Sequence, residues 1–393
     1  MGKHTVRVKR NYEGARIEDI VSAMRTGIVP SVNDLSGLLA AEGDDFAVLC
    51  SAAQGVRMAT VGPNVYLRGL IEMGNRCRKN CFYCGIRRGN RAVHRYAITD
   101  GDVVSAARFA HRNGYASLAL QAGEDVSPAF TDRIEALLYR IADATNGELG
   151  ITLSLGEQAQ ATYHRWRAAG AMRYLLRIET SSPALYATLH PRDGLHAFDA
   201  RLAAIAALRA SGYHVGSGVM IGIPGQTLQD LANDLLWLRS VDVDMVGMGP
   251  YLPHPQTPLW ARRDELWPID VRLRVSIAMV AALRLLMPDI NIAATTALQA
   301  IVADGRERAI AAGANVIMPN ITPQGRQDDY SLYDRKPLAA NAEDDSLASL
   351  SARIAALGCR VAVGNQGNSL HFGRRVAGEA DWEEPSMPSG PNA

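Results

Sequence analysis

The chain has 393 residues, of which 41 are Lys or Arg and 40 are Asp or Glu, giving a net charge of +1. Because the opposite charges nearly cancel, the protein has no strong net field that would attract nucleic acid or an anionic membrane surface. The N-terminal residues also lack the continuous apolar stretch of a signal peptide or a membrane-spanning helix, so we expect a cytoplasmic protein with a small-molecule substrate and no nucleic-acid or membrane partner.

The first predicted elements are helices. Between residues 15 and 60, apolar positions recur three and four apart, as in ARIEDIVSAMR and NDLSGLLAAEG. This is the spacing of one face of a helix. We predict that residues 1–60 form an N-terminal helical extension.

From about Val65 onward, short apolar runs alternate with amphipathic stretches. The predicted strands are 65–74, 117–123, 150–156, 173–180, 216–222, 245–252, 290–297 and 314–322. Continuous apolar strands suit a parallel sheet that is covered on the outside, and eight β/α units close a barrel. We therefore predict an α/β fold, a (βα)8 TIM barrel over residues 61–335, with an open doubly wound sheet as the alternative. In a barrel, reactive residues gather at the C-terminal ends of the strands.

The pattern weakens after about residue 335. We predict a C-terminal addition over residues 336–378, in which ASLSARIAALGCRVAV supplies one helix and one strand. Residues 379–393 are polar, contain proline and have no periodicity, so we expect a disordered tail. Cys50 and Cys359 lie in apolar surroundings and are interpreted as buried structural thiols.

The other three cysteines lie within eight residues, in the array Cys77-Arg-Lys-Asn-Cys81-Phe-Tyr-Cys84, directly after the first predicted barrel strand. This spacing indicates metal ligation and not a disulfide framework. With three cysteine ligands, a 4Fe-4S cluster keeps one iron open to an exogenous ligand. A zinc site would need a fourth ligand, and His94 has no paired partner. A thioredoxin-like redox pair would leave Cys77 unexplained.

Charged residues mark the ends of later strands. The segment LLRIET places Arg177 and Glu179 on one face of the fourth strand, because side chains alternate along a strand. Charges deep in a barrel are costly unless they are paired or bind a charged ligand, which favours a ligand-gripping pair over a plain salt bridge. Arg201, in AFDARL, has the planar fork that suits a carboxylate. Gly123 and Glu124, in LQAGED, end the second strand, where the alternative is a glycine turn with a solvated acid.

The cysteine segment GNRCRKNCFYCGIRRGN resembles the biotin synthase-like group of radical S-adenosylmethionine (SAM) enzymes. The resemblance implies that one 4Fe-4S cluster held by Cys77, Cys81 and Cys84 binds and reductively cleaves SAM. It also implies the residues that contact SAM, which are Tyr83 on the adenine, Gly123 and Glu124 at the amino group, and Glu179 and Arg201.

Within this group, the strings TLSLGE, GIPGQT, DMVGMGPYLPHPQTPL, ATTALQAI and GANVIMPNITP resemble the HydE family, the SAM-dependent maturases of FeFe-hydrogenase. That resemblance spans roughly residues 60–335. It implies assembly chemistry on a small sulfur- and iron-containing precursor, with an electron donor such as ferredoxin or flavodoxin and other hydrogenase maturases as partners. The implied substrate-lining residues are Thr152, Arg177, Thr295, Thr296, Tyr330 and Tyr333. Hydroxyl groups and a guanidinium suit an anionic guest.

The sequence departs from this family in three places. Many members carry a second cysteine set in the C-terminal region, whereas only Cys359 lies beyond residue 84 here, so we expect a single cluster. Ile178 and Ala122 stand where the family usually has histidine and serine, and both changes remove a polar group near the predicted cavity. They leave open a paralogue with another small substrate, or a mutase similar to the methylornithine synthases. A non-enzymatic iron-sulfur scaffold is the alternative of a different class, and it would have no use for a SAM clamp.

Overall fold

The structure is a computed structural model that describes residues 16–323, 325, 329–334 and 346–378. Its strands are β1 (Asn64–Gly74), β2 (Ser117–Ala122), β3 (Gly150–Ser154), β4 (Ala171–Leu175), β5 (His214–Ser217), β6 (Met220–Ile221), β7 (Met245–Val246), β8 (Gly249–Pro250), β9 (Asn291–Ile292), β10 (Val316–Ile317) and β11 (Arg360–Val361). Every pairing between them is parallel among these residues.

The strands form a barrel. The main sheet has the order β10-β1-β2-β3-β4-β5-β7-β9, and a bridge between Ala293 and Val316 joins its two ends. β6 and β8 pair with each other beyond β5 and β7, so two of the predicted strands are each interrupted once. At this interruption the backbones of the two strands approach each other closely. A Cβ on Gly218 would lie 2.0 Å from the carbonyl oxygen of Gly247. The predicted (βα)8 barrel is confirmed, and the open sheet is not.

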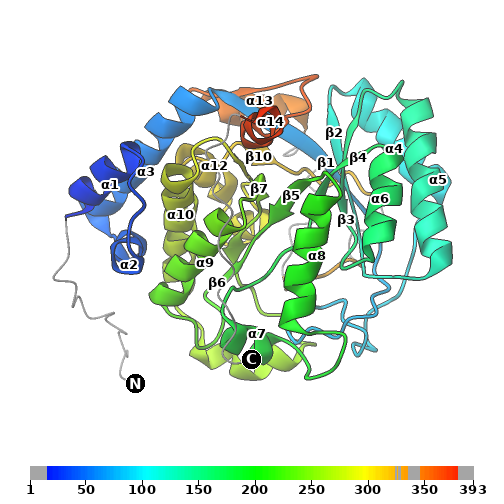
Figure 1. Cartoon of the computed structure of the whole chain (residues 1–393), viewed down its shortest axis with the longest axis horizontal. Helices are drawn as coiled ribbons and strands as arrows, with labels where there is room; N and C mark the ends of the chain where they lie inside the picture. Colours follow the sequence, from blue (N-terminus) through cyan, green and yellow to red (C-terminus); the bar gives the residue numbers. More distant parts are fainter. Residues whose placement is uncertain (1–15, 324, 326–328, 335–345, 379–393) are drawn as a thin grey trace.

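Helices cover the outside of the barrel (Figure 1). The helices that follow the first strand are α4 (Asp100–Arg112), α5 (Pro128–Ala144), α6 (Gln160–Ala168), α7 (Pro183–Leu189), α8 (Phe198–Ala210), α9 (Leu228–Ser240), η1 (Pro258–Glu265), α10 (Ile269–Leu286), α11 (Thr296–Gln299) and α12 (Gly305–Ala311), of which α7 and α11 lie at the end of the barrel that holds the site. The predicted stripe Ile134, Leu137, Leu138 and Ile141 is buried on α5, as an amphipathic helix packed on a sheet requires. No helix in the described part of the chain has the length and apolar character needed to cross a membrane.

The N-terminal segment is helical, with α1 (Ile17–Arg25), α2 (Val32–Ala40) and α3 (Gly43–Thr60). These helices pack beside the barrel, where α3 contacts α10 and α2 contacts α9 (Figure 1). Cys50, on α3, is only half-buried, which differs from the expected buried thiol. The domain boundaries that the sequence predicts stay predictions, and residues 1–15 lie outside the described residues.

A C-terminal arm closes the end of the barrel where the strands begin. The predicted helix and strand of this region are α13 (Leu347–Ala355) and β11, which pairs with the start of β1. The buried thiol of Cys359 accepts a hydrogen bond from Arg57 at 2.9 Å, as expected of a structural cysteine. The predicted disordered tail, residues 379–393, lies outside the described residues.

The last helix of the arm, α14 (Leu370–Ala377), was not predicted, and it docks through ion pairs. His371 bridges Asp242 at 2.5 Å and Asp289 at 3.1 Å, and Arg375 reaches Asp244 at 2.7 Å. None of its residues is fully buried. Figure 1 shows α13 and α14, in orange and red, at the end of the barrel opposite α7, so the other end is left for the site.

Candidate functional site

The three cysteines line one cavity of about 350 Å³ at the C-terminal ends of the strands. Cys81 is buried, and Cys77 and Cys84 are half-buried. All three lie on the loop that follows β1, and the Cys77 sulfur accepts a hydrogen bond from the backbone amide of Glu124 at 3.3 Å. The loop therefore presents three sulfur donors to an enclosed space.

Arg95 holds this loop in shape. Its guanidinium donates hydrogen bonds to four backbone carbonyls, those of Asn75 at 2.6 Å, Ile86 at 2.7 Å, Arg87 at 2.6 Å and Asn90 at 3.0 Å. Irregular backbone has carbonyl groups without ladder partners, and one planar fork satisfies several of them at once. The positions of the cysteines thus depend on a residue that lies eleven positions beyond the last of them.

The donor set suits a cluster of several metal atoms. Burial raises the pKa of the thiols of Cys77 and Cys84, and it raises the pKa of Cys81 to about 12. Without a cation the thiols would stay protonated, so the three sulfurs act as thiolates only beside bound metal. Nowhere in the described chain do three His, Cys, Asp or Glu side chains converge on one ion. Donors spread around a cavity wall fit one iron each of a 4Fe-4S cluster, and they do not fit tetrahedral zinc.

The end of β2 lies directly against the cysteine loop. A Cβ on Gly123 would lie 2.2 Å from the carbonyl oxygen of Arg76 and 2.8 Å from the Cβ of Cys77, so only glycine permits this approach. Glu124 follows and is buried in the cavity wall. One of its carboxylate oxygens accepts the backbone amide of Glu157 at 2.8 Å, and burial raises the pKa of its carboxyl group. A bound ammonium would stabilise the charged form.

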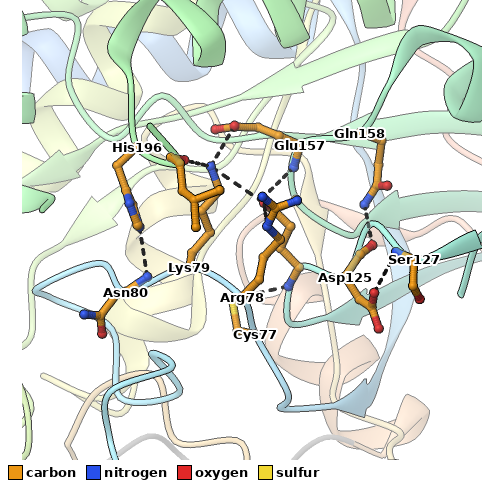
Figure 2. A network of polar contacts seen from close by, with 12 residues as sticks. Cys77, Arg78, Lys79, Asn80, Asp125, Ser127, Glu157, Gln158 and His196 are labelled. Atoms are coloured by element: carbon orange, nitrogen blue, oxygen red, sulfur yellow. Dashed lines mark hydrogen bonds and ion pairs between the residues drawn. The ribbon is translucent and has the colours of Figure 1, made fainter. Parts of the chain in front are cut away.

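A buried network of charges surrounds this carboxylate. Lys79 contacts Glu157 at 2.7 Å and Glu124 at 3.6 Å, while the guanidinium of Arg201 contacts Glu157 at 2.5 Å. Burial alone would raise the pKa of Glu157, but the charges of Arg201 and Lys79 outweigh it and lower that pKa. Figure 2 shows Lys79 beside Glu157, and shows the next residue, Asn80, donating its backbone amide to His196 at 2.9 Å. The network ties the cysteine loop to β3, α8 and the loop before α8.

Arg177 and Glu179 both line the cavity, as predicted, although β4 ends before them at Leu175. Glu179 has a φ of 71°, in the left-handed region that non-glycine residues rarely adopt. A parallel bridge to Val219 holds it there. One carboxylate oxygen lies 3.2 Å from Arg177, and the other lies 3.4 Å from the hydroxyl of Tyr83. Backbone strain that the surroundings maintain is typical of functional sites.

The remaining predicted residues divide into two sets. Thr295, Thr296 and Tyr333 line the same cavity, the two threonines at the start of α11. Thr152 and Tyr330 are buried but do not line it. Thr152 lies on β3 two residues before Ser154, which does line the cavity. The threonine hydroxyl is buried without a hydrogen-bond partner.

Comparisons with known proteins agree with this geometry. The family model of the radical SAM superfamily matches residues 71–238. The chain is 43% identical over 289 residues to the [FeFe] hydrogenase maturase subunit HydE of Thermotoga maritima, covering 73% of this chain and 79% of the relative. The chain belongs to the radical SAM superfamily. It is an enzyme, and the family implies a 4Fe-4S cluster and SAM as its cofactors.

Two further likenesses of this radical SAM chain are to methylornithine synthases. The 3-methylornithine synthase of Methanosarcina barkeri is 28% identical over 333 residues, covering 84% of this chain and 90% of the relative. A crystal structure of methylornithine synthase (PylB) superposes with a TM-score of 0.76 at 25% identity, covering 88% of this chain and 98% of that one. The barrel is therefore that of the superfamily.

Sequence reasoning missed Lys79, Glu157 and Glu72 as parts of the site. Lys79 lies inside the cysteine array, where its charge gives no sign that it is buried. Glu157 could have been found, because it follows Gly156 at the end of β3 as Glu124 follows Gly123 at the end of β2. Glu72 points inward from β1 and lines the cavity, while its carboxylate accepts the side-chain amide of Asn320 at 3.0 Å. A single acidic residue in an apolar strand could have indicated this position, because burying a charge is costly unless it meets a partner or a ligand.

Proposed function

We propose that this radical SAM enzyme is a HydE-like maturase, which acts on a small sulfur- and iron-containing precursor during assembly of the FeFe-hydrogenase H-cluster. The observation that carries the proposal is one cavity that combines three cysteine sulfurs, buried carboxylates and a separate set of guanidinium and hydroxyl donors. The 43% identity to a HydE maturase supports the same function.

Cys77, Cys81 and Cys84 would hold the cluster. When bound, the cluster supplies the electron that cleaves SAM to methionine and a 5'-deoxyadenosyl radical. The chain's own residues bind and orient SAM. Glu124 offers a buried acceptor to the ammonium, and Glu179 offers a buried carboxylate whose oxygens lie 3.2 Å from Arg177 and 3.4 Å from the hydroxyl of Tyr83. A fixed SAM and an enclosed cavity decide which bond the radical meets first.

The other part of the cavity would hold the substrate. Arg177 brings a positive charge, Thr295, Thr296 and Tyr333 bring hydroxyl groups, and Glu72 brings a negative charge. Burial raises the pKa of Tyr333, so its hydroxyl stays protonated and can donate a hydrogen bond. These groups suit a small guest that carries both anionic and cationic parts.

We also propose a single cluster. Among the described residues, Cys359 is hydrogen-bonded to Arg57, and Cys50 lies on α3 outside the barrel. An electron donor such as ferredoxin or flavodoxin would supply the electron, other hydrogenase maturases would be partners, and the cytoplasm would be the compartment.

Reductive cleavage of SAM is the first test. The anaerobically reconstituted protein should release 5'-deoxyadenosine from SAM with dithionite, and Cys81→Ala should abolish the release and lower the iron content. Cys50→Ala is the matched control and should change neither. Failure of the iron-loaded native protein to release any 5'-deoxyadenosine would refute radical SAM activity.

The substrate needs a second test, because the superposition with methylornithine synthase makes a lysine mutase the second candidate function. The native protein should replace a HydE maturase in an in-vitro maturation of apo-hydrogenase, and Arg177→Met should not. Formation of methylornithine from lysine, without support of hydrogenase maturation, would favour the second candidate and refute the first.

A further inference from the structure

The loop that holds the cysteines carries positive charge out of proportion to the chain. The whole sequence has 41 basic and 40 acidic residues. Residues 75–95 contain no Asp or Glu. Their basic residues are Arg76, Arg78, Lys79, Arg87, Arg88, Arg91 and Arg95. The chain as a whole is therefore nearly neutral, but the loop that carries the cluster ligands has a local excess of positive charge.

Three of these basic side chains, Arg78, Lys79 and Arg95, already have partners within the molecule. Lys79 is buried and paired with Glu157, and Arg95 is bound to four backbone carbonyls. Arg78 lies 3.9 Å from the buried carboxylate of Glu124. These contacts account for the three side chains, so no partner protein is needed to explain them.

The outer members have no such role. Arg76, Arg88 and Arg91 are exposed and Arg87 is half-buried, and we call these four the basic rim. No carboxylate of the described residues lies within 4.0 Å of any of them. Asp193 feels the charge of Arg88 but is hydrogen-bonded to His196.

The basic rim lies on the outer side of the cysteine loop. The backbone amide of Arg88 donates to the carbonyl of Lys79 at 2.8 Å, so this part of the rim folds back onto the segment that joins Cys77 and Cys81. The backbone amide of Arg87 donates to the carbonyl of Cys84 at 3.2 Å. Arg76 precedes Cys77 directly in the chain. Arg91 follows Asn90, whose side-chain amide donates to the carbonyl of Gly85 at 2.7 Å, so all four rim residues belong to segments bonded to the cysteine loop.

We propose that the basic rim is the docking surface of an acidic one-electron carrier protein. This rests on the proposed function, which requires an electron at the cluster while SAM and substrate occupy the cavity. The electron then has to enter through the outer face of the cysteine loop. Unpaired arginines there attract carboxylates, and electrostatic steering raises the rate of encounter without a large interface. Electron-transfer complexes bury small areas and are transient, which suits a rim of a few side chains.

The test compares two ways of reducing the same holoenzyme. Arg88→Glu combined with Arg91→Glu should raise the KM for reduced flavodoxin or ferredoxin by about tenfold in 5'-deoxyadenosine release, because it replaces attraction with repulsion. The dithionite-driven rate should stay unchanged, since dithionite needs no docking surface. The Kd of the complex should weaken as salt rises for the native protein and should depend much less on salt for the variant. Assaying the two carriers separately decides whether the rim serves the flavin protein, the iron-sulfur protein or both.

The matched control is Arg108→Glu combined with Arg112→Glu, two exposed arginines on α4. This control should leave the KM for either carrier unchanged. Should the Glu variant also lose dithionite activity, Arg88→Gln combined with Arg91→Gln replaces it and should give an intermediate KM. A KM that does not move in either variant, or that moves equally in the control, overturns the proposal. Absence of 5'-deoxyadenosine with dithionite in the native protein would instead overturn the proposed function.

Discussion

Glu157→Gln tests whether the charge network around the cysteine loop stabilises the fold. Glu157 is the shared partner of Lys79 and Arg201, at 2.7 Å and 2.5 Å, and these cations are only 5% and 6% exposed. At an effective dielectric constant of about 20, each contact gives about 6 kcal/mol of attraction before desolvation is subtracted. Breaking a buried pair from one side costs about 3–5 kcal/mol, and the lower end applies here because Lys79 keeps Glu124 at 3.6 Å as a second partner. We expect the free energy of unfolding to fall by about 3 kcal/mol.

Urea denaturation followed by circular dichroism measures this change as a shift of the midpoint at constant slope. Asp100→Asn is the matched control. Asp100 also accepts from two arginines, Arg133 at 2.7 Å and Arg140 at 3.4 Å, but all three side chains are partly exposed. The control should cost about 1 kcal/mol or less. A loss in Glu157→Gln no larger than in the control would show that water already screens the network, and the reasoning would fail.

Three further changes test other parts of the structure. Gly123→Ala should displace the cysteine loop and lower the iron bound on reconstitution. Gly55→Ala is the control and should not, because no atom lies near the added Cβ. Equal iron contents in the two variants would show that the loop tolerates a side chain at position 123. Burial alone would lower the pKa of His371, but its two aspartate partners raise that pKa to about 9. The stability this gives, about 3 kcal/mol, is complete below pH 6.5 and is lost as the pH rises through about 9. The protection of the α14 backbone amides from hydrogen exchange should fall as this stability is lost, and His371→Asn should remove the pH dependence. Protection that does not change with pH in the native protein would refute the role of His371. Ala122→Ser should alter substrate turnover and leave SAM cleavage without substrate unchanged, because this residue lines the cavity; a fall in both rates would assign the position to SAM.

The barrel was predictable because its signals are local. Apolar runs marked each strand, and the stripe on α5 marked a covering helix. The breaks inside two strands were not predictable, since they arise where Gly218 meets the backbone of Gly247, two segments that are distant in the sequence. The docking of α14 was missed for a similar reason. Its ion pairs with Asp242, Asp244 and Asp289 and the stacking of Phe372 on His214 all join segments that are distant in the sequence, so its docking leaves no local signal.

The site was predictable where chemistry and sequence spacing coincide. The cysteine array is contiguous, and Glu124 and Glu179 stand in short motifs that follow β2 and β4. Lys79 and Glu157 were missed because a buried ion pair depends on two loops meeting in space. Thr152 was expected on the cavity wall and does not line it, because it lies two residues before Ser154 on β3, where the strand is deeper in the barrel.

The departures from the family at Ile178 and Ala122 differ in what they change. Ile178 was expected near the cavity, but its side chain is fully buried in the main apolar core and is absent from the cavity wall. Ala122 does line the cavity, one residue before Gly123. A histidine at position 178 would point away from the guest between Arg177 and Glu179, because neighbouring side chains here face opposite ways. Under the proposed function, we therefore expect substrate specificity to depend on Ala122 and on the donors around it, and not on Ile178.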